Sequence, residues 1–357
     1  MSCALFGTCG GCDAWVRGSD EKRLAEVARL RELASYDGPV SHAATPDWHF
    51  RDKLDFSIAG GQLGLMALDG NAVVDIERCP LLTPPLQEWL TAFRATIPKH
   101  ADKIAVRLRV APDGKRGVWL RLGHEATKMW LDEGHWWEGL REQAQVEVGE
   151  RLKPLLAQGK LGKRAALHPW FATFTGEDLV PTPLYGHVGS FTQTGFAPNR
   201  VLVAAVRSQL PATPGRALEL FAGLGNFTLP LASWGWEVES FELRPHAATA
   251  MRLSLEGRPW AQRVRFGTGN HYGATLPPME GYDLLLADPP RSGMGAPLLD
   301  ALAASGPAAL IYVSCDTATF AADGLALARG GYRLQHVTGV DQFPHTRRME
   351  WVGRFVR

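Results

Sequence analysis

The sequence predicts an α/β protein of two domains, one built on a parallel β-sheet and one smaller and rich in β-strands. The chain has 357 residues, which is long for one domain and natural for two. Strand-like and helix-like segments alternate in its C-terminal half, a pattern typical of a parallel sheet with helices on both faces. We place a cysteine-rich segment and the start of the β-rich domain at 1–90, the rest of that domain at 91–189 and the parallel-sheet domain at 190–357.

The composition favours a cytoplasmic protein without a membrane segment. Hydrophobic residues make up 45% of the chain, and no apolar run is long enough to span a bilayer. The first residues lack the basic start and long apolar stretch of a signal peptide. Nothing in the sequence indicates an obligate protein partner.

The N-terminal half contains one expected helix and several expected strands. Four apolar residues at helical spacing predict an amphipathic helix over 20–35; they are Leu24, Val27, Leu30 and Leu33. Residues 54–78 are expected to form short strands that Gly60-Gly61 and Asp69-Gly70 interrupt.

Two segments of the middle region are basic. Alternating residues over 104–110 and 118–122 predict a hairpin with one apolar face and one basic face. Residues 153–164 carry four basic side chains and no acidic one. Because the formal net charge of the chain is only +1, a polyanionic partner would have to be attracted by local basic surfaces of this kind.

The C-terminal half predicts the elements of the parallel sheet in order. Strands are expected at 217–221, up to Glu242, at 264–266, at 284–287 and at 310–313, and helices at 198–209, 245–256 and 296–304. Ligands of such sheets bind beyond the carboxyl ends of the strands. Residues that directly follow these strands are therefore the first candidates for a site.

The loop after the first of these strands is a candidate ligand loop. It holds Gly223 and Gly225, which let a backbone approach a ligand closely. Glu242 ends the next strand, where a carboxylate accepts hydrogen bonds from ribose hydroxyls, and Asn270 follows the third. The spacing also permits an ordinary tight turn or an NAD site, although Thr228 stands where a dinucleotide loop has its third glycine.

Three further residues lie where chemistry is expected. Asp288 follows the strand at 284–287. Cys315 follows the strand at 310–313, ahead of several polar residues, which is a poor match to a buried structural cysteine. Glu350 stands just before the terminal strand and is a candidate general base. Their ordinary interpretations are a capped strand exit, a small buried residue and a solvated carboxylate.

Together these segments resemble the RNA uracil-C5 methyltransferase family. The matching segments are 190–194 (SFTQT), 220–227 (LFAGLGNF), 288–291 (DPPR), 314–315 (SC) and 341–346 (DQFPHT) with Glu350. Their order and spacing along nearly the whole chain are specific, although no single motif is. The resemblance implies a Rossmann-like S-adenosylmethionine-dependent methyltransferase domain plus a smaller β-rich domain that carries an iron–sulfur site.

The resemblance also implies roles for individual residues. It places six at the S-adenosylmethionine site: Gln193, Phe221, Asn226, Glu242, Asn270 and Asp288, the last with a possible contact to the uracil edge instead. It makes Cys315 the nucleophile and Glu350 the base. A thiolate that adds to C6 of uracil turns the ring into an enolate whose C5 accepts a methyl group, and a base then removes the C5 proton. The uridine must leave its stack to reach Cys315, which implies a flipped base.

Three segments depart from the family's pattern. Asp316-Thr317 replaces an Asn-Pro pair after the cysteine, Ala222 replaces a cysteine, and Arg347-Arg348-Met349 replaces a Gly-His-hydrophobic run. None of the three removes the nucleophile or the base. The first changes the polarity next to Cys315.

Four cysteines lie in the first quarter of the chain: Cys3, Cys9, Cys12 and Cys79. In a reducing cytosol, clustered cysteines indicate a metal site before disulfides. Their spacing leaves zinc and a [4Fe–4S] cluster open. The resemblance implies the iron–sulfur cluster, because family members with ribosomal RNA targets often carry this pattern, and it predicts a structural or RNA-positioning role.

The expected partner is RNA, with 23S rRNA first and transfer RNA second. The sequence starts at the cysteines, so we expect the additional N-terminal RNA-binding β-barrel of many relatives to be absent. RNA contact then falls to Arg107, Arg109, Arg121 and the stretch 153–164. Two rivals from other classes stay open at this point, an NAD-dependent oxidoreductase on the same sheet and a non-catalytic iron–sulfur RNA-binding protein.

Overall fold

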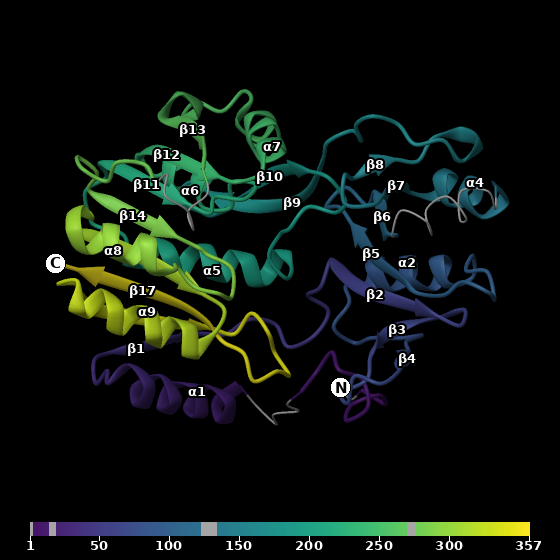
Figure 1. The fold of residues 1–357 in the computed structure, drawn as a ribbon, viewed down its shortest axis with the longest axis horizontal. Coiled ribbons are helices and arrows are strands. Elements are labelled where there is room, and N and C mark those ends of the chain that lie inside the picture. The colour runs from purple at the N-terminus through teal and green to yellow at the C-terminus, as the bar shows by residue number, and fades with distance from the viewer. Residues whose placement is uncertain (1–2, 14–18, 123–133, 270–275) are drawn as a thin grey trace. The chain divides into compact units, whose positions relative to one another are not determined.

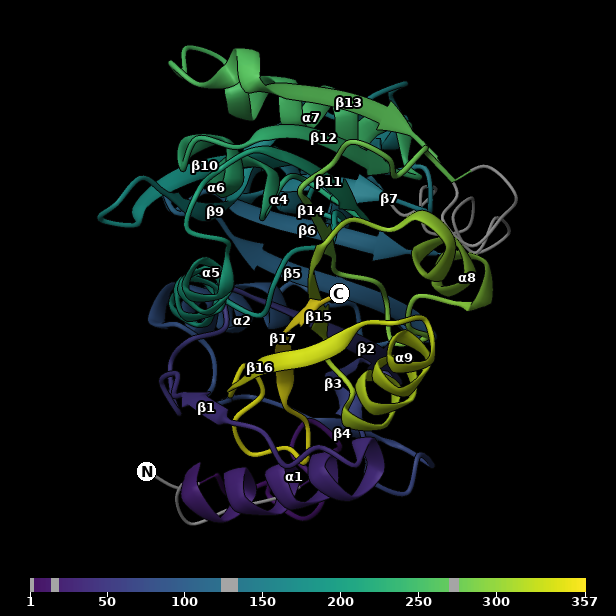
Figure 2. The same ribbon diagram turned by 90° about the vertical axis from the view of Figure 1, so that its left-hand side faces the viewer.

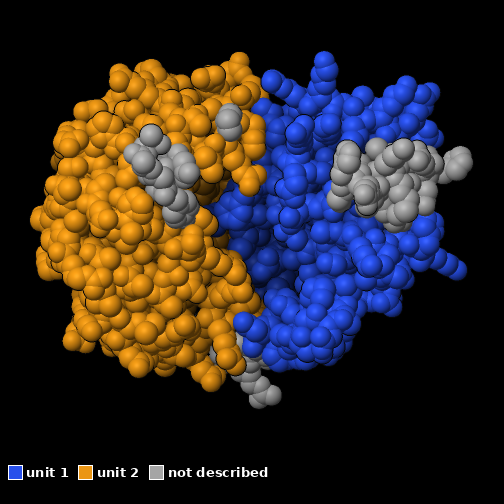
Figure 3. Space-filling view, in the orientation of Figure 1, with its two compact units in different colours: residues 1–15, 46–171, 185–196 blue, residues 16–45, 172–184, 197–357 orange. Residues whose placement is uncertain are grey.

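A computed structural model describes residues 3–13, 19–122, 134–269 and 276–357. The chain forms two compact units, coloured separately in Figure 3. Unit 1 comprises 1–15, 46–171 and 185–196, and unit 2 comprises 16–45, 172–184 and 197–357. In the described part of the chain, no helix has the length and apolarity needed to cross a membrane.

Unit 1 is built on a seven-stranded sheet with the strand order β4-β3-β2-β5-β6-β7-β8 (Figure 1). Its strands are β2 (Lys53–Ala59), β3 (Gln62–Met66), β4 (Val73–Asp75), β5 (Ile104–Val110), β6 (Arg116–Arg121), β7 (Gln145–Val148) and β8 (Lys153–Pro154). The described helices are α2 (Pro84–Arg94), α4 (Gly134–Gln143) and the short η1 (Ala157–Gly159). Leu86, Trp89, Leu90 and Phe93 of α2 are fully buried in the core of this unit. The predicted β-rich domain and its glycine-interrupted strands are confirmed.

The predicted hairpin is present, but Arg107 and Arg109 do not form the expected exposed basic face, whereas Arg121 at the end of β6 is exposed. β5 and β6 pair in antiparallel register, yet Arg109 is fully buried. Arg107 forms two hydrogen bonds with Asp55, at 2.6 and 2.8 Å, and donates to the carbonyl oxygens of Gly189 and Ser190. A buried guanidinium needs acceptors, so these two arginines hold the 187–192 segment inside unit 1. They are not a surface for RNA.

Unit 2 contains an eight-stranded sheet in the order β1-β16-β17-β15-β14-β11-β12-β13 (Figures 1 and 2). Its strands are β1 (Val40–Ala43), β11 (Arg216–Leu220), β12 (Glu237–Glu242), β13 (Val264–Thr268), β14 (Leu284–Ala287), β15 (Ala309–Ser314), β16 (Arg333–Val340) and β17 (Glu350–Val356). β17 runs antiparallel to both neighbours, and the other pairs are parallel. β9 (His168–Thr175) and β10 (Val180–Gly186) pair in a separate two-stranded sheet. Residues 172–184 of this sheet belong to unit 2.

Helices cover both faces of the eight-stranded sheet, as the sequence predicts. They are α1 (Ser19–Ala34), α5 (Phe196–Gln209), α6 (Thr228–Ser233), α7 (Pro245–Leu255), α8 (Ala296–Ser305) and α9 (Thr317–Arg329). Two hydrophobic cores lie on the two faces of the sheet. On one face, α1, α8 and α9 pack against every second residue of the strands, and on the other face α5 and α6 pack against the residues between them. Burial on both faces explains why the central strands are almost entirely apolar. The predicted strands and helices of this half are confirmed.

The units do not follow sequence order, unlike the domains expected at 1–90, 91–189 and 190–357. Residues 16–45 belong to unit 2, because β1 extends the sheet in parallel beside β16 and α1 packs on α9 (Figure 2). These contacts join positions about 300 residues apart, which local patterns do not reveal.

The helix predicted over 20–35 is present as α1, but its expected apolar face is partly wrong. Leu30 is fully buried, whereas Leu24 is 64% exposed and Leu33 is also exposed. Lys22 and Glu26 are buried instead. Polar groups in other parts of unit 2 are their partners, so this helix buries a polar stripe beside its apolar one.

Candidate active site, cofactor loop and cysteine cavity

Cys315, Asp288 and Glu350 meet at one edge of the eight-stranded sheet. β14 and β15 are parallel neighbours, and Asp288 and Cys315 directly follow their carboxyl ends. β17 runs antiparallel to β15, with Trp351 opposite Ser314. The first residue of β17, Glu350, therefore lies at the same edge as Cys315. The three candidates, which the sequence analysis identified separately, form one group in unit 2.

The Cys315 thiol is partly buried and surrounded by charged groups. Burial is the largest cause of a pKa that is raised to about 11, and the Glu350 carboxylate raises it further. The Arg291 guanidinium lowers the pKa through its charge and a side-chain hydrogen bond, and Asp288 raises it. A pKa raised this far keeps the thiol protonated at neutral pH, and Arg291 is the group that favours the thiolate.

The two carboxyl groups beside the thiol also have raised pKa values. Glu350 is 2% exposed, and burial, followed by the charge of Asp288, raises its pKa well above the ordinary value while Arg291 opposes the shift. Burial raises the pKa of Asp288 to about 7. Carboxyl groups with raised pKa values, grouped around a nucleophile at a strand edge, are typical of acid–base chemistry.

Asp316 has a separate, structural task. Its carboxylate accepts a hydrogen bond from the backbone N–H of Thr319 at 2.8 Å and caps the N-terminus of α9. Aspartate and asparagine serve equally well at such a cap. The replacement of asparagine in the family's pattern thus keeps the cap, and the charges that shift the pKa of Cys315 come from Glu350, Arg291 and Asp288.

The loop after β11 has the backbone of a ligand-binding turn. Phe221 adopts a φ of 62°, a strained value for a bulky residue. Gly225 has a φ of 96°, and a side chain there would meet Leu229 at 2.7 Å. Gly223 has a φ of 57° and open space where its side chain would begin. The backbone at Gly223 is thus accessible, as close approach of a ligand requires.

Glu242 holds this loop against the end of β12. Its carboxylate accepts hydrogen bonds from the backbone N–H groups of Gly223 at 2.9 Å and Arg244 at 3.1 Å. A small hollow lies beside it, lined by Ser240, Glu242, Arg244, Ala248, Met251, Phe266, Gly267 and Thr268. Asn270, predicted to follow β13 at this place, lies outside the described residues.

Asn226 is fixed by a partner that the sequence analysis missed. Its side-chain amide exchanges two hydrogen bonds with that of Asn199 on α5, at 2.8 and 2.9 Å. Thr173 donates to the Asn226 carbonyl oxygen at 2.6 Å. The available signal was an asparagine among the mostly apolar buried positions of α5, of which Gln209 is the other polar member. The contribution of Asn226 to a cofactor site stays a prediction.

A buried carboxylate beneath the loop was also missed. Glu219 in β11 is 1% exposed and accepts hydrogen bonds from the hydroxyls of Thr228 and Ser240. Burial raises its pKa to about 7 despite these bonds, and Asp288 adds to the shift. Glu219 thus fixes the underside of the glycine loop. Gln193, another predicted cofactor residue, is 8% exposed and belongs to unit 1.

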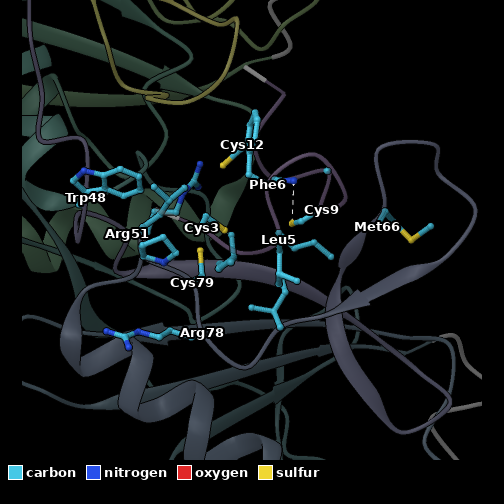
Figure 4. A pocket seen from close by; sticks show the side chains of 17 residues that line it. Cys3, Leu5, Phe6, Cys9, Cys12, Trp48, Arg51, Met66, Arg78 and Cys79 are labelled. Carbon is cyan, nitrogen blue, oxygen red and sulfur yellow. Dashed lines mark hydrogen bonds between the residues drawn. The ribbon is translucent and has the colours of Figure 1, made fainter. Parts of the chain in front are cut away.

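The four N-terminal cysteines line a single cavity in unit 1. Figure 4 shows Cys3, Cys9, Cys12 and Cys79 around this space, whose volume is about 280 Å³. Burial, followed by the charges of neighbouring cysteines, raises the pKa of Cys12 to about 12. Among the residues that the structure describes, no three His, Cys, Asp or Glu side chains are grouped closely enough to hold a metal ion. The metal site therefore stays a prediction.

Local packing explains how sequence-distant cysteines come together. Cys9 forms a β-bridge with Ala67, and Gly10 donates from its backbone N–H to the Met66 carbonyl oxygen at 2.8 Å. A side chain at Gly10 would lie 2.6 Å from that oxygen, so only glycine permits the contact. Arg51 lines the same cavity and brings positive charge beside Cys12 and Cys79.

Comparisons with known proteins identify the relatives of this chain. An RNA methyltransferase of Bdellovibrio bacteriovorus, named as uncharacterized, is 31% identical, and the match covers 100% of this chain and 95% of the relative. A 23S rRNA (uracil(1939)-C(5))-methyltransferase of Alkalilimnicola ehrlichii is 30% identical over 99% of this chain and 82% of its own length. No family model matches the chain.

One solved structure shows the same fold over the whole chain. The tRNA (uracil-54, C5)-methyltransferase of Pyrococcus abyssi, in complex with S-adenosyl-L-homocysteine, has a TM-score of 0.69 at 22% sequence identity. The match covers 100% of this chain and 87% of that one. At this level of identity the likeness concerns the fold.

The fold is that of an α/β methyltransferase, and relatives named as methyltransferases match nearly the whole chain. The chain belongs to the RNA uracil-C5 methyltransferase family, because the Alkalilimnicola ehrlichii enzyme, which has this activity in its name, is 30% identical over 99% of the chain. The resemblance drawn from the sequence is thereby confirmed. The alternative that glycine spacing left open, an NAD-dependent oxidoreductase, has no support among these relatives.

Proposed function

We propose that this enzyme methylates C5 of a uridine in RNA, with 23S rRNA as the target, through a covalent bond between Cys315 and C6 of the uracil. The observation that carries the proposal is the grouping of Cys315, Glu350, Asp288 and Arg291 at one sheet edge. The names of the relatives support the ribosomal target. We place the protein in the cytoplasm, where such RNA is made.

The residues of this edge divide the work of the reaction. Arg291 favours the thiolate of Cys315, which adds to C6 and leaves the electron pair of the C5–C6 bond on the C5 side as an enolate. After C5 has gained its methyl group, the Glu350 carboxylate removes the C5 proton. The electrons of the C5–H bond restore the double bond and expel the Cys315 thiolate. The positive charge that the sulfonium donor loses with its methyl group reappears as the proton on Glu350, which leaves to solvent, so charge and electrons balance.

The cofactor site of unit 2 fits S-adenosylmethionine. The open backbone at Gly223, the carboxylate of Glu242 and the hollow beside it lie at the ends of β11 and β12. We propose Phe221, Asn226, Glu242, Asn270 and Asp288 as its binding residues in this unit. Gln193, which belongs to unit 1, stays a separate prediction. When bound, S-adenosylmethionine supplies the electrophilic methyl group.

We further propose that Cys3, Cys9, Cys12 and Cys79 hold a [4Fe–4S] cluster. Four cysteines around one cavity of about 280 Å³ are the ligand type and number that such a cluster uses. The Arg51 guanidinium offsets part of the negative charge that four thiolates bring. The cluster would tie the N-terminal segment to Cys79 in the loop after β4, which is a structural role.

Replacing Cys12 by serine is expected to remove the cluster. Anaerobically purified protein should lose its brown colour and about four equivalents of iron and acid-labile sulfide, because a hydroxyl is a poor ligand for iron. Iron, sulfide and zinc are measured on the same sample. Unchanged iron in the Cys12→Ser protein would remove Cys12 from the ligand set, and one equivalent of zinc without sulfide in the unsubstituted protein would make the site a zinc site.

The target is tested by analysis of the methylated product. The enzyme is incubated with labelled S-adenosylmethionine and with either unmodified 23S rRNA or unmodified transfer RNA, and the nucleosides are separated. We expect 5-methyluridine in the ribosomal RNA. Label confined to transfer RNA would make transfer RNA the target instead, and label in another nucleoside would overturn the proposed reaction.

Lys160, Lys163 and Arg164, all exposed in unit 1, are the basic residues that we propose for RNA contact.

A further inference from the structure

The segment that carries Cys315 is attached at both ends to the residue next to Glu350. At one end, Ser314 lies opposite Trp351 in the antiparallel pairing of β15 with β17. At the other end, the Thr317 hydroxyl accepts a hydrogen bond from the Trp351 indole N–H at 2.9 Å. Trp351 therefore contacts the segment 314–317, which contains Cys315, at its first and its last residue. Glu350 precedes Trp351 directly in the chain.

The hydroxyl of Thr317 is also anchored from the opposite side. It donates a hydrogen bond to the Glu26 carboxylate on α1, at 2.5 Å. Thr317 is 3% exposed, Trp351 is fully buried and Glu26 is 7% exposed. One hydroxyl therefore accepts from an indole and donates to a carboxylate, away from water, where such bonds are strong and directional. Its rotation is fixed by both partners.

A second contact from α1 supports the other side of the site. Lys22 lies one helical turn before Glu26, so that both face the same way. Its ammonium group donates to the Asp341 carboxylate, and to the Phe343 carbonyl oxygen at 2.9 Å. Asp341 and Phe343 belong to the loop between β16 and β17 that leads to Glu350. The buried polar stripe of α1 therefore holds both segments that carry the proposed nucleophile and base.

This arrangement depends on a residue in which the sequence departs from its family. Thr317 stands where the family's pattern has proline after the asparagine. Proline has no hydroxyl, so it can neither accept from an indole N–H nor donate to a carboxylate. The bridge from Trp351 through Thr317 to Glu26 is thus a property of this chain.

We propose that the hydrogen-bonded chain of Trp351, Thr317 and Glu26 positions Cys315 against Glu350 and thereby sets the rate of the chemical steps. The inference rests on the proposed covalent mechanism and adds three positioning residues to it. None of them needs to touch substrate. Their effect is on the distance and orientation of the two reacting side chains, where an error of about 1 Å costs up to about 100-fold in rate.

Thr317→Val tests the proposal because it keeps the shape of the side chain and removes the hydroxyl. We expect kcat for methylation to fall about tenfold, with the KM values for S-adenosylmethionine and RNA within about twofold of the original, since positioning acts on the reacting geometry. Single-turnover formation of the covalent adduct should slow by the same factor. Thr317→Ser, which restores the hydroxyl, should recover most of the rate.

Trp351→Phe provides a second, independent removal of the same bond. It should lower kcat by a similar factor, and the double variant should be no slower than the slower single variant, because both changes break one chain. This variant also decides the matter if Thr317→Val does not fold. A matched control is Thr182→Val, which removes a buried hydroxyl that bonds to Thr175 at 2.6 Å in the two-stranded sheet of unit 2. It should lower the melting temperature without lowering kcat.

The proposal is overturned if Thr317→Val or Trp351→Phe keeps the original kcat, if Thr317→Ser does not recover the rate, or if the two losses simply multiply. Failure of the proposed function has a different signature. In that case the unsubstituted enzyme itself forms no adduct with RNA, whatever residue stands at position 317.

Discussion

Replacing Cys315 by alanine is expected to abolish uracil methylation, with kcat/KM falling by about 10⁴-fold or more, as for nucleophiles of other covalent enzymes. C5 of uracil reacts with an alkyl donor only after a nucleophile has added to C6. Cys315 is the one thiol among the described residues of unit 2. Without it, Asp288, Arg291 and Glu350 have no group to activate.

The measurement is methyl transfer to RNA under single-turnover conditions, which isolates chemistry from product release. Affinity for S-adenosylhomocysteine and the melting temperature serve as controls, and both should stay near the values of the unsubstituted protein. Cys315→Ser should be nearly as inactive, because a serine hydroxyl is far less acidic than a thiol. Activity above about one tenth of the original in the alanine variant would contradict the role of Cys315.

Replacing Glu350 by glutamine is expected to stop the reaction at a later point, with turnover reduced about 1000-fold, within the usual range for a general base. Addition of the thiolate and methylation still proceed, but the C5 proton is not removed. Ordinary uridine-containing RNA should therefore stay attached to the Glu350→Gln protein and survive denaturation. If neither adduct nor product forms, or if turnover is unchanged, Glu350 is not the base.

The same variant should change the reactivity of the thiol in a predictable direction. The Glu350 carboxylate raises the pKa of Cys315, so its replacement by a neutral amide should lower that pKa and speed alkylation by iodoacetamide at a given pH. Arg291→Gln should act with the opposite sign, because Arg291 lowers the pKa. In the unsubstituted protein the rate should rise about tenfold per pH unit until it levels near the pKa of about 11. Equal rates in all three proteins would contradict the charged surroundings described for Cys315.

The succession of strands and helices in the C-terminal half, and the meeting of Asp288 and Cys315 at one sheet edge, were predicted from the sequence. Apolar strands such as 284–287 and 310–313 carry their own signal, because a parallel sheet buried on both faces leaves no polar alternation. Residues at their carboxyl ends are then brought together by the handedness and direction of the crossovers. Asp288 and Cys315 could be placed at one edge for this reason alone.

Other features depend on contacts that no local pattern contains. Lys22 can be buried because Asp341, 319 positions away, accepts a hydrogen bond from its ammonium group. Arg109 was expected on a basic surface, yet alternation in a strand only says that a residue faces one side, not which elements cover that side. Asn199 and Glu219 were missed because their partners come from separate strands and loops.

The most direct test of the covalent mechanism is a trap with 5-fluorouridine-substituted 23S rRNA and labelled S-adenosylmethionine. Fluorine at C5 cannot leave as a proton, so the enzyme should stop with Cys315 bonded to C6. We expect a denaturation-resistant complex of one protein and one RNA that carries the label, and mass spectrometry should place the bond on Cys315. The absence of a complex from enzyme that methylates normal RNA, or its persistence in the Cys315→Ala protein, would contradict the mechanism.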